Sequence, residues 1–143
     1  MPAVRKSVIV PHPAEVMFDL VDDCERYPEF LPWCRSATLL ERTPEITRGR
    51  LGIDFRGFRS EITTRNRKVP GRSMTLELVD GPFERFEGLW TFTPLGDAGS
   101  RVELGVDYTF ASGALQALVA PVFSHITGTL VERFVQRADE VAE

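Results

Sequence analysis

The sequence predicts an α+β fold in which a curved antiparallel sheet of about six to seven strands surrounds a long C-terminal helix. Residues 33–110 alternate between apolar and polar side chains, with turn residues between the runs. Residues 112–138 instead place apolar side chains every three or four positions. A chain of 143 residues can bury a core of its own, so we expect a single domain over residues 1–143.

The N-terminal quarter predicts a strand, a short helix and a connection. Residues 4–10 are rich in β-branched side chains, which favours a strand. Pro13 suits the first turn of a helix, and apolar side chains at helical spacing continue to about Asp23. Residues 24–34, CERYPEFLPWC, contain two prolines, which exclude a long helix or a central strand. We therefore expect an irregular, apolar connection there.

The alternating region divides into hairpin-linked strands, each with one buried and one solvent-exposed face. Its charged side chains share one parity, whereas the opposite parity carries apolar residues together with a few Ser, Thr, Asn and Gly. The turn signals are Gly57, Pro70-Gly71, Asp80-Gly81-Pro82 and Gly96 to Gly99.

The C-terminal segment predicts a helix that Ser112 can cap and that Pro121 should kink or split near Ala117. Residues 108–131 contain no charged side chain, a length that could span a membrane. Their strand-like beginning and scattered polar residues favour a helix buried around much of its circumference. The order of strand, short helix, antiparallel strands and long helix describes a helix-grip fold.

The charges are unevenly distributed. The chain has 17 Lys and Arg against 21 Asp and Glu, which argues against a DNA-binding protein. Nine of the 17 basic residues nevertheless fall within residues 42–72. They could contact ribosomal RNA or anionic lipid head groups, or form a solvated face paired with Asp54 and Glu61. The surface-docking candidates share the outer face of one predicted hairpin: Arg48, Arg50, Arg56, Arg59, Arg65 and Arg67.

The inner face predicts binding rather than catalysis. Because the carboxylates of the strands point outward, the interior offers no acid–base pair and no metal-ligand set, so we expect no enzyme and no required cofactor. Apolar side chains with a few hydroxyls and amides suit either a filled core or a pocket for a hydrophobic ligand with a small polar head group. Cys24 and Cys34, with no secretory signal, suit free thiols in the cytoplasm.

Three motifs carry a resemblance to a known family. They are YPEFLPWC (residues 27–34), TTRN (residues 63–66) and LVDGPFERFEGLWTFTPL (residues 78–95). Together they resemble the coenzyme-Q-binding, RatA-like branch of the START superfamily, often labelled polyketide cyclase/dehydrase. The resemblance implies a START-like helix-grip fold with a tunnel between the sheet and the last helix. It also implies either quinone binding or association with the large ribosomal subunit.

From this resemblance we expect a protein that binds and chaperones ubiquinone or a related isoprenoid quinone in support of respiratory electron transfer. Peripheral contact with the inner face of the membrane would accompany that role. The alternative is a toxin-like inhibitor of translation on the large ribosomal subunit, and a polyketide cyclase or dehydratase is less supported. The tunnel candidates are Tyr27, Phe30, Leu31, Trp33, Phe58, Ile62, Met74, Leu76, Phe86, Trp90, Phe92, Tyr108, Leu118, Val122, Phe123, Ile126 and Leu130.

Overall fold

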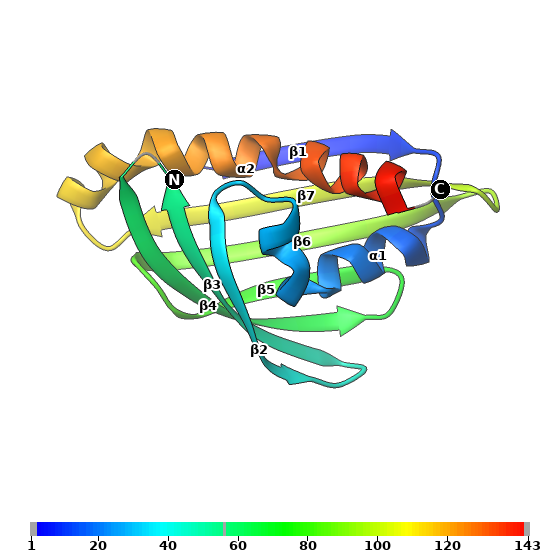
Figure 1. Cartoon of the computed structure of the whole chain (residues 1–143), viewed down its shortest axis with the longest axis horizontal. Coiled ribbons are helices and arrows are strands. Elements are labelled where there is room, and N and C mark those ends of the chain that lie inside the picture. The colour runs from blue at the N-terminus through cyan, green and yellow to red at the C-terminus, as the bar shows by residue number, and fades with distance from the viewer. Residues whose placement is uncertain (1–2, 56, 142–143) are drawn as a thin grey trace.

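The predicted fold class is confirmed by a computed structural model, which describes residues 3–55 and 57–141. One seven-stranded antiparallel sheet has the order β1-β7-β6-β5-β4-β3-β2, and a long helix crosses it (Figure 1). The elements are β1 (Ala3–Val10), α1 (Ala14–Asp22), the 3₁₀ helix η1 (Cys24–Glu29), β2 (Cys34–Arg42), β3 (Ile46–Phe55), β4 (Phe58–Val69), β5 (Ser73–Asp80), β6 (Phe83–Leu95), β7 (Gly99–Phe110) and α2 (Gly113–Val141).

The connection between β1 and β2 is more ordered than the sequence predicts. The carbonyl of Pro13 accepts hydrogen bonds from the N–H groups of Val16 and Met17, so α1 begins directly after this proline. Residues 24–29 then form η1 instead of an irregular segment. The short 3₁₀ helix accommodates Pro28 near its end. This segment joins the two edge strands of the sheet and so closes one end of the fold (Figure 1).

Helix α2 differs from its prediction in two respects. The Ser112 hydroxyl accepts from Leu115 N–H at 3.1 Å, as expected of a cap, but Pro121 does not split the helix, which runs unbroken over 29 residues. Val119 and Phe123 are buried on either side of the proline and hold both halves against the sheet. The expected burial around the circumference is also wrong, because α2 buries one stripe and leaves Leu118 76% exposed.

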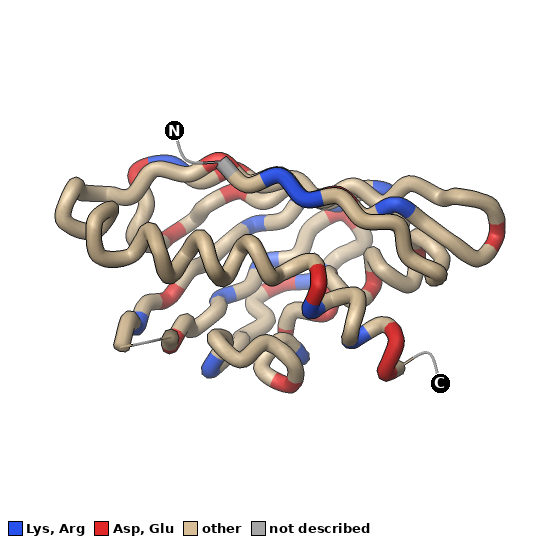
Figure 2. Tube along the Cα trace, turned by 90° about the horizontal axis from the view of Figure 1, so that it is seen from above, with Lys and Arg blue, Asp and Glu red and all other residues tan. Residues whose placement is uncertain are grey.

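The position of α2 explains this narrow stripe. The helix packs against β1, β7 and α1, on the concave side of the sheet (Figures 1 and 2). Strands β2 to β4 curve around the other flank of the helix, where the Phe55 ring of β3 stacks on the His125 ring of α2 with centroids 5.4 Å apart. By length and composition α2 could cross a membrane, yet its apolar stripe forms the core with the inward residues of the sheet. The interior therefore lies between α2 and the inward side chains of the curved sheet.

Candidate functional site

A cavity of about 110 Å³ lies in the interior, between α2, η1 and the inner faces of β3 to β7. Its wall is almost entirely apolar, as the sequence pattern predicts for the inner face. The structure brings ten of the tunnel candidates together around it: Tyr27, Trp33, Ile62, Met74, Leu76, Phe86, Trp90, Phe123, Ile126 and Leu130.

The other tunnel candidates do not line this cavity. Leu118 points to solvent, because it lies on the side of α2 away from the sheet. Phe92 and Tyr108 lie in the solid part of the core, where they pack against Trp90 and Phe123 respectively. The candidates outside the wall are Phe30, Leu31, Phe58, Phe92, Tyr108, Leu118 and Val122.

Several wall residues were missed as site candidates. Most lie on the inward parity of the strands, so alternation could have found them. Cys24 lies on η1 and lacks such a signal. A side chain at Gly49 would meet Cys24 Sγ at 3.0 Å, so this glycine lets η1 approach β3. Asn66 also lines the cavity, as one of the inward amides that the sequence offers to a polar head. The missed wall residues are Val21, Cys24, Gly49, Leu51, Ile53, Thr64, Leu104, Val106, Thr127 and Phe134.

Two polar atoms of the wall are left without a partner. Trp33 Nε1 and Asn66 Oδ1 are buried and, in the described part of the chain, make no hydrogen bond. A buried donor or acceptor left unpaired costs about 1–3 kcal/mol. By contrast, the Thr127 hydroxyl donates to the Phe123 carbonyl at 2.9 Å, and the Tyr27 hydroxyl donates to the Val21 carbonyl. Both residues line the cavity, while the unpaired atom of each is itself covered by the surrounding side chains.

An aromatic cluster fastens the segment that closes the cavity. Tyr27 and Phe30 each meet the ring of Phe134 edge to face, with centroids 5.4 Å and 5.3 Å apart. Arg137 lies over the Phe30 ring and its guanidinium also donates to Glu29 at 2.6 Å. These contacts tie the loop around η1 to the last turns of α2, so access to the cavity from this end requires them to separate.

A buried ionic cluster lies behind η1, contrary to the expectation of an inner face without charged groups. Lys68 continues the inward parity of β4, and its side chain is only 4% exposed. Its Nζ lies 3.0 Å from Asp22 Oδ2, and the Thr47 hydroxyl donates to Asp22 Oδ1 at 2.6 Å. Arg42 lies 3.5 Å from the same carboxylate and also binds Glu25. The end of α1 is thus anchored to β2, β3 and β4.

Charge and burial shift several pKa values in this region. Hydrogen bonds from the Arg42 guanidinium lower the pKa of Glu25 to about 2. Burial raises the pKa of Cys24 and of Cys34 to about 11, and both are free thiols, as expected. In the described ranges, no three His, Cys, Asp or Glu side chains gather as a metal site would require.

The outer face of β3 and β4 carries the predicted arginines, but many have acidic neighbours. Arg65 and Arg67 lie 3.7 Å and 2.6 Å from one carboxylate oxygen of Glu77. The expected pair between Arg59 and Asp54 is present at 3.2 Å. Arg48 lies 4.0 Å from Glu41, and Arg50 donates to the Thr63 hydroxyl at 3.4 Å. Arg56 lies outside the described residues.

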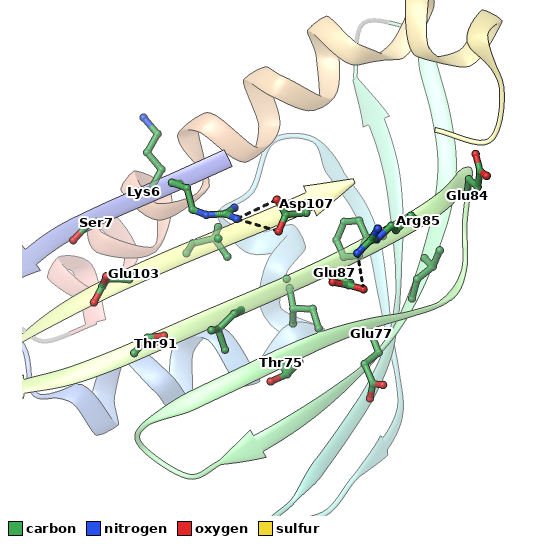
Figure 3. A pocket seen from close by; sticks show the side chains of 18 residues that line it. Lys6, Ser7, Thr75, Glu77, Glu84, Arg85, Glu87, Thr91, Glu103 and Asp107 are labelled. Carbon is green, nitrogen blue, oxygen red and sulfur yellow. Dashed lines mark hydrogen bonds and ion pairs between the residues drawn. The ribbon is translucent and has the colours of Figure 1, made fainter. Parts of the chain in front are cut away.

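The remainder of the outer face is acidic. A groove of about 970 Å³ crosses β1, β7, β6 and β5, where β5 and β6 separate beyond the paired residues Glu77 and Glu87 (Figure 3). Arg5 binds both oxygens of Asp107 at 3.0 Å within it. Carboxylates outnumber basic groups in its lining, so the groove would repel phosphates. The outer surface is therefore divided into a basic half on β3 and β4 and an acidic half.

The comparisons with known proteins agree with this architecture. The family described as polyketide cyclase / dehydrase and lipid transport matches residues 10–135. The chain belongs to this family. Ribosome association toxin RatA of Pseudomonas aeruginosa is 36% identical over 138 residues, covering 96% of each chain. The mitochondrial coenzyme Q-binding protein coq10 of Schizosaccharomyces pombe is more distant, at 27% identity over 94% of this chain and 85% of that protein.

A solved structure extends the likeness to three dimensions. A START superfamily protein from Mycobacterium smegmatis superposes with a TM-score of 0.82 at 21% identity, covering 97% of this chain and 98% of that chain. This confirms the START-like fold. The sequence relatives confirm the RatA-like branch, and they place RatA nearer than the coenzyme Q-binding protein.

Proposed function

We propose that this protein associates with the large ribosomal subunit and restrains translation, with the basic outer face of β3 and β4 as its contact surface. The similarity to RatA over almost the whole of both chains favours this over the quinone-centred hypothesis. The observation that carries the proposal is the division of the outer sheet into a basic and an acidic half. Ribosomal RNA is a polyanion, so only the basic half is suited to it.

The ion pairs on the basic half do not oppose this role. The pairs of Arg59, Arg65 and Arg67 are solvent-exposed, and such pairs contribute little to stability because water and salt screen them. An arginine can therefore exchange an exposed carboxylate for an RNA phosphate at small cost. The geometry of the guanidinium, which donates two parallel hydrogen bonds, suits phosphate oxygens.

The test is co-sedimentation with purified large subunits. We expect the triple variant Arg50→Gln, Arg59→Gln and Arg65→Gln to bind more weakly and with a flatter salt dependence. In a plot of the logarithm of the binding constant against the logarithm of the salt concentration, the magnitude of the slope should fall by about 0.7–0.9 for each RNA phosphate that no longer meets an arginine. The matched control neutralises three basic residues of the acidic half, Lys6, Arg85 and Arg101. Equally weakened binding in both triple variants would show only a net-charge effect and contradict the assignment of the surface.

A second function, the binding of a small hydrophobic ligand, is supported by the cavity. A quinone such as ubiquinone fits the apolar wall and is consistent with the distant likeness to the coenzyme Q-binding protein. Its ring and isoprenoid tail exceed 110 Å³, since drug-sized ligands occupy about 300–1,000 Å³. Binding would therefore require α2 or η1 to move outward. Transfer of such cargo at an anionic membrane could use the same arginines.

This second function predicts a bound molecule in the freshly purified protein. Native mass spectrometry followed by solvent extraction would identify it. Ile126→Phe narrows the cavity from α2 and should abolish retention, whereas Leu118→Phe enlarges an exposed side chain of the same helix and should not. A protein that retains no ligand and takes up no short-chain quinone in solution would contradict the second function and leave the first. Neither function includes a covalent step.

A further inference from the structure

Four charged side chains form a row across the outer face of β2 to β5. Arg48 of β3 and Arg65 of β4 lie directly opposite each other at its centre. Glu41 of β2 lies opposite the first arginine and Glu77 of β5 opposite the second. Like charges that face each other across two strands destabilise the pairing. Negative charge close to both guanidinium groups would remove that cost.

The two flanking carboxylates supply this negative charge only in part. Arg48 Nη1 lies 4.0 Å from Glu41 Oε1. Arg65 Nε lies 3.7 Å from Glu77 Oε1, an atom that already accepts from Arg67 at 2.6 Å. Distances of 3.7 Å and 4.0 Å exceed a hydrogen bond, and within the described ranges neither central guanidinium makes one. Both arginines therefore keep their donors available to an external acceptor.

A cavity of about 470 Å³ is lined by these two arginines, and Glu41, Ile46 and Val79 complete its lining. Val79 is the extra residue of a β-bulge, because its neighbours Leu78 and Asp80 pair with consecutive residues of β4. A bulge turns a side chain out of the regular alternation of its strand. The Val79 side chain is 51% exposed. The cavity thus places an exposed apolar surface beside two cationic groups.

Resting on the ribosome association proposed above, we propose that this cavity receives one unpaired nucleotide of ribosomal RNA. Its phosphate lies between Arg48 and Arg65, and its ribose and base pack on Ile46 and Val79. A guanidinium donates two parallel hydrogen bonds to phosphate oxygens, so two guanidinium groups can hold one phosphate from opposite sides.

The size of the cavity favours a nucleotide that has left the RNA helix. Its volume of about 470 Å³ falls in the range of small-molecule sites, about 300–1,000 Å³. The bases of a duplex are stacked and cannot enter such a cavity, whereas loops and bulges of RNA present bases that have left the stack. The contact therefore distinguishes irregular RNA from a regular helix, which the net charge of the basic face does not.

Single substitutions test the site by co-sedimentation with purified large subunits. We expect Arg48→Gln and Arg65→Gln each to weaken binding about tenfold, because each removes hydrogen bonds to a charged group. The double variant should also lose about tenfold, and not a hundredfold, because one phosphate needs both arginines. The matched control is Arg59→Gln, which removes the same charge from the same face outside the cavity. Its loss should be about twofold, since salt screens a charge that makes no direct contact.

The apolar side of the cavity has a matched pair of its own. Val79→Ser should weaken binding about fivefold, because it removes apolar contact with the nucleotide. It should leave the salt dependence unchanged, because no phosphate contact is lost. Val69→Ser changes another exposed valine of the same sheet, 57% exposed and outside the cavity, and should not alter binding.

The outcomes separate this site from the function beneath it. If the wild-type protein does not sediment with the subunits, ribosome association and the site are both overturned. If it does, but Arg48→Gln and Arg65→Gln bind no more weakly than Arg59→Gln, or their losses multiply in the double variant, the site is overturned and the association stands.

Two further results also decide the matter. Unchanged subunit binding of Arg48→Gln and Arg65→Gln, with weaker binding to vesicles that contain phosphatidylglycerol, would assign the arginines to a lipid phosphate and overturn the site. Losses that do not multiply, together with weaker binding of Val79→Ser than of Val69→Ser, would support it.

Discussion

Lys68 Nζ lies 3.0 Å from Asp22 Oδ2, and this buried ion pair joins the last residue of α1 to strand β4. Burying two charges is unfavourable unless they are paired and hydrogen-bonded. The Thr47 hydroxyl and the Arg42 guanidinium meet that requirement for the carboxylate. The pair thereby sets the position of the segment that closes the cavity, which begins two residues after Asp22.

Removing one partner of this pair should be strongly destabilising. We expect Asp22→Asn to lower the free energy of unfolding by about 3–5 kcal/mol, because Lys68 is left as an uncompensated buried charge. Lys68→Met should be milder, since Arg42 and Thr47 still contact Asp22. Urea unfolding measures both. In the exposed pair with Arg59, Asp54→Asn should cost about 1 kcal/mol or less, and an equally small cost at Asp22 would contradict the ion-pair assignment.

Two glycines should respond oppositely to alanine. A Cβ at Gly88 of β6 would lie 2.8 Å from Leu76 Cδ1, so Gly88→Ala should displace this wall residue and lower stability by about 1–3 kcal/mol. A Cβ at Gly128 of α2 meets nothing within 4 Å, so Gly128→Ala should raise stability by about 0.5–1 kcal/mol. Thermal unfolding of the two variants measures both changes in stability. A stabilising Gly88→Ala would contradict the close approach of Leu76 to Gly88.

The pair between Arg42 and Glu25 should make stability depend on pH in acid. The pKa of Glu25 is lowered from 4.5 to about 2 by hydrogen bonds from Arg42, so its contribution is complete above about pH 5 and is lost as the pH falls towards 2. We therefore expect Glu25→Gln to be less stable than wild type at pH 6, by about 1 kcal/mol or less, and equally stable near pH 2. Denaturation series at several pH values test this, and a difference that does not vary with pH would contradict it.

The two thiols should be inert in the folded protein. With the pKa of Cys24 and Cys34 raised to about 11 by burial, the thiolate fraction at neutral pH is on the order of 10⁻⁴. Iodoacetamide should therefore label both slowly in buffer and rapidly in urea, as mass spectrometry can follow. Cys24 lines the cavity and Cys34 does not, so a bound ligand should slow labelling of Cys24 in particular. Fast labelling in the absence of denaturant would show that η1 opens readily.

Much of this architecture follows from local sequence pattern. Alternation assigned the inward parity of β3 to β7, because one face of each strand is buried and the other is wet. The cap at Ser112 and the turn at Gly57 were predicted on local grounds as well. The basic stripe was also predictable, since charge and parity are both properties of the sequence.

The sequence by itself determined the fold class, the branch of the family and the basic face. Only the tertiary structure decided which apolar side chains border empty space, that Lys68 enters the interior, and that Leu118 lies in solvent. The physical reason is that a cavity and a packed core present the same periodicity. They differ in how closely elements distant in the sequence approach one another, and the contacts of Asp22 and Phe134 set that approach here.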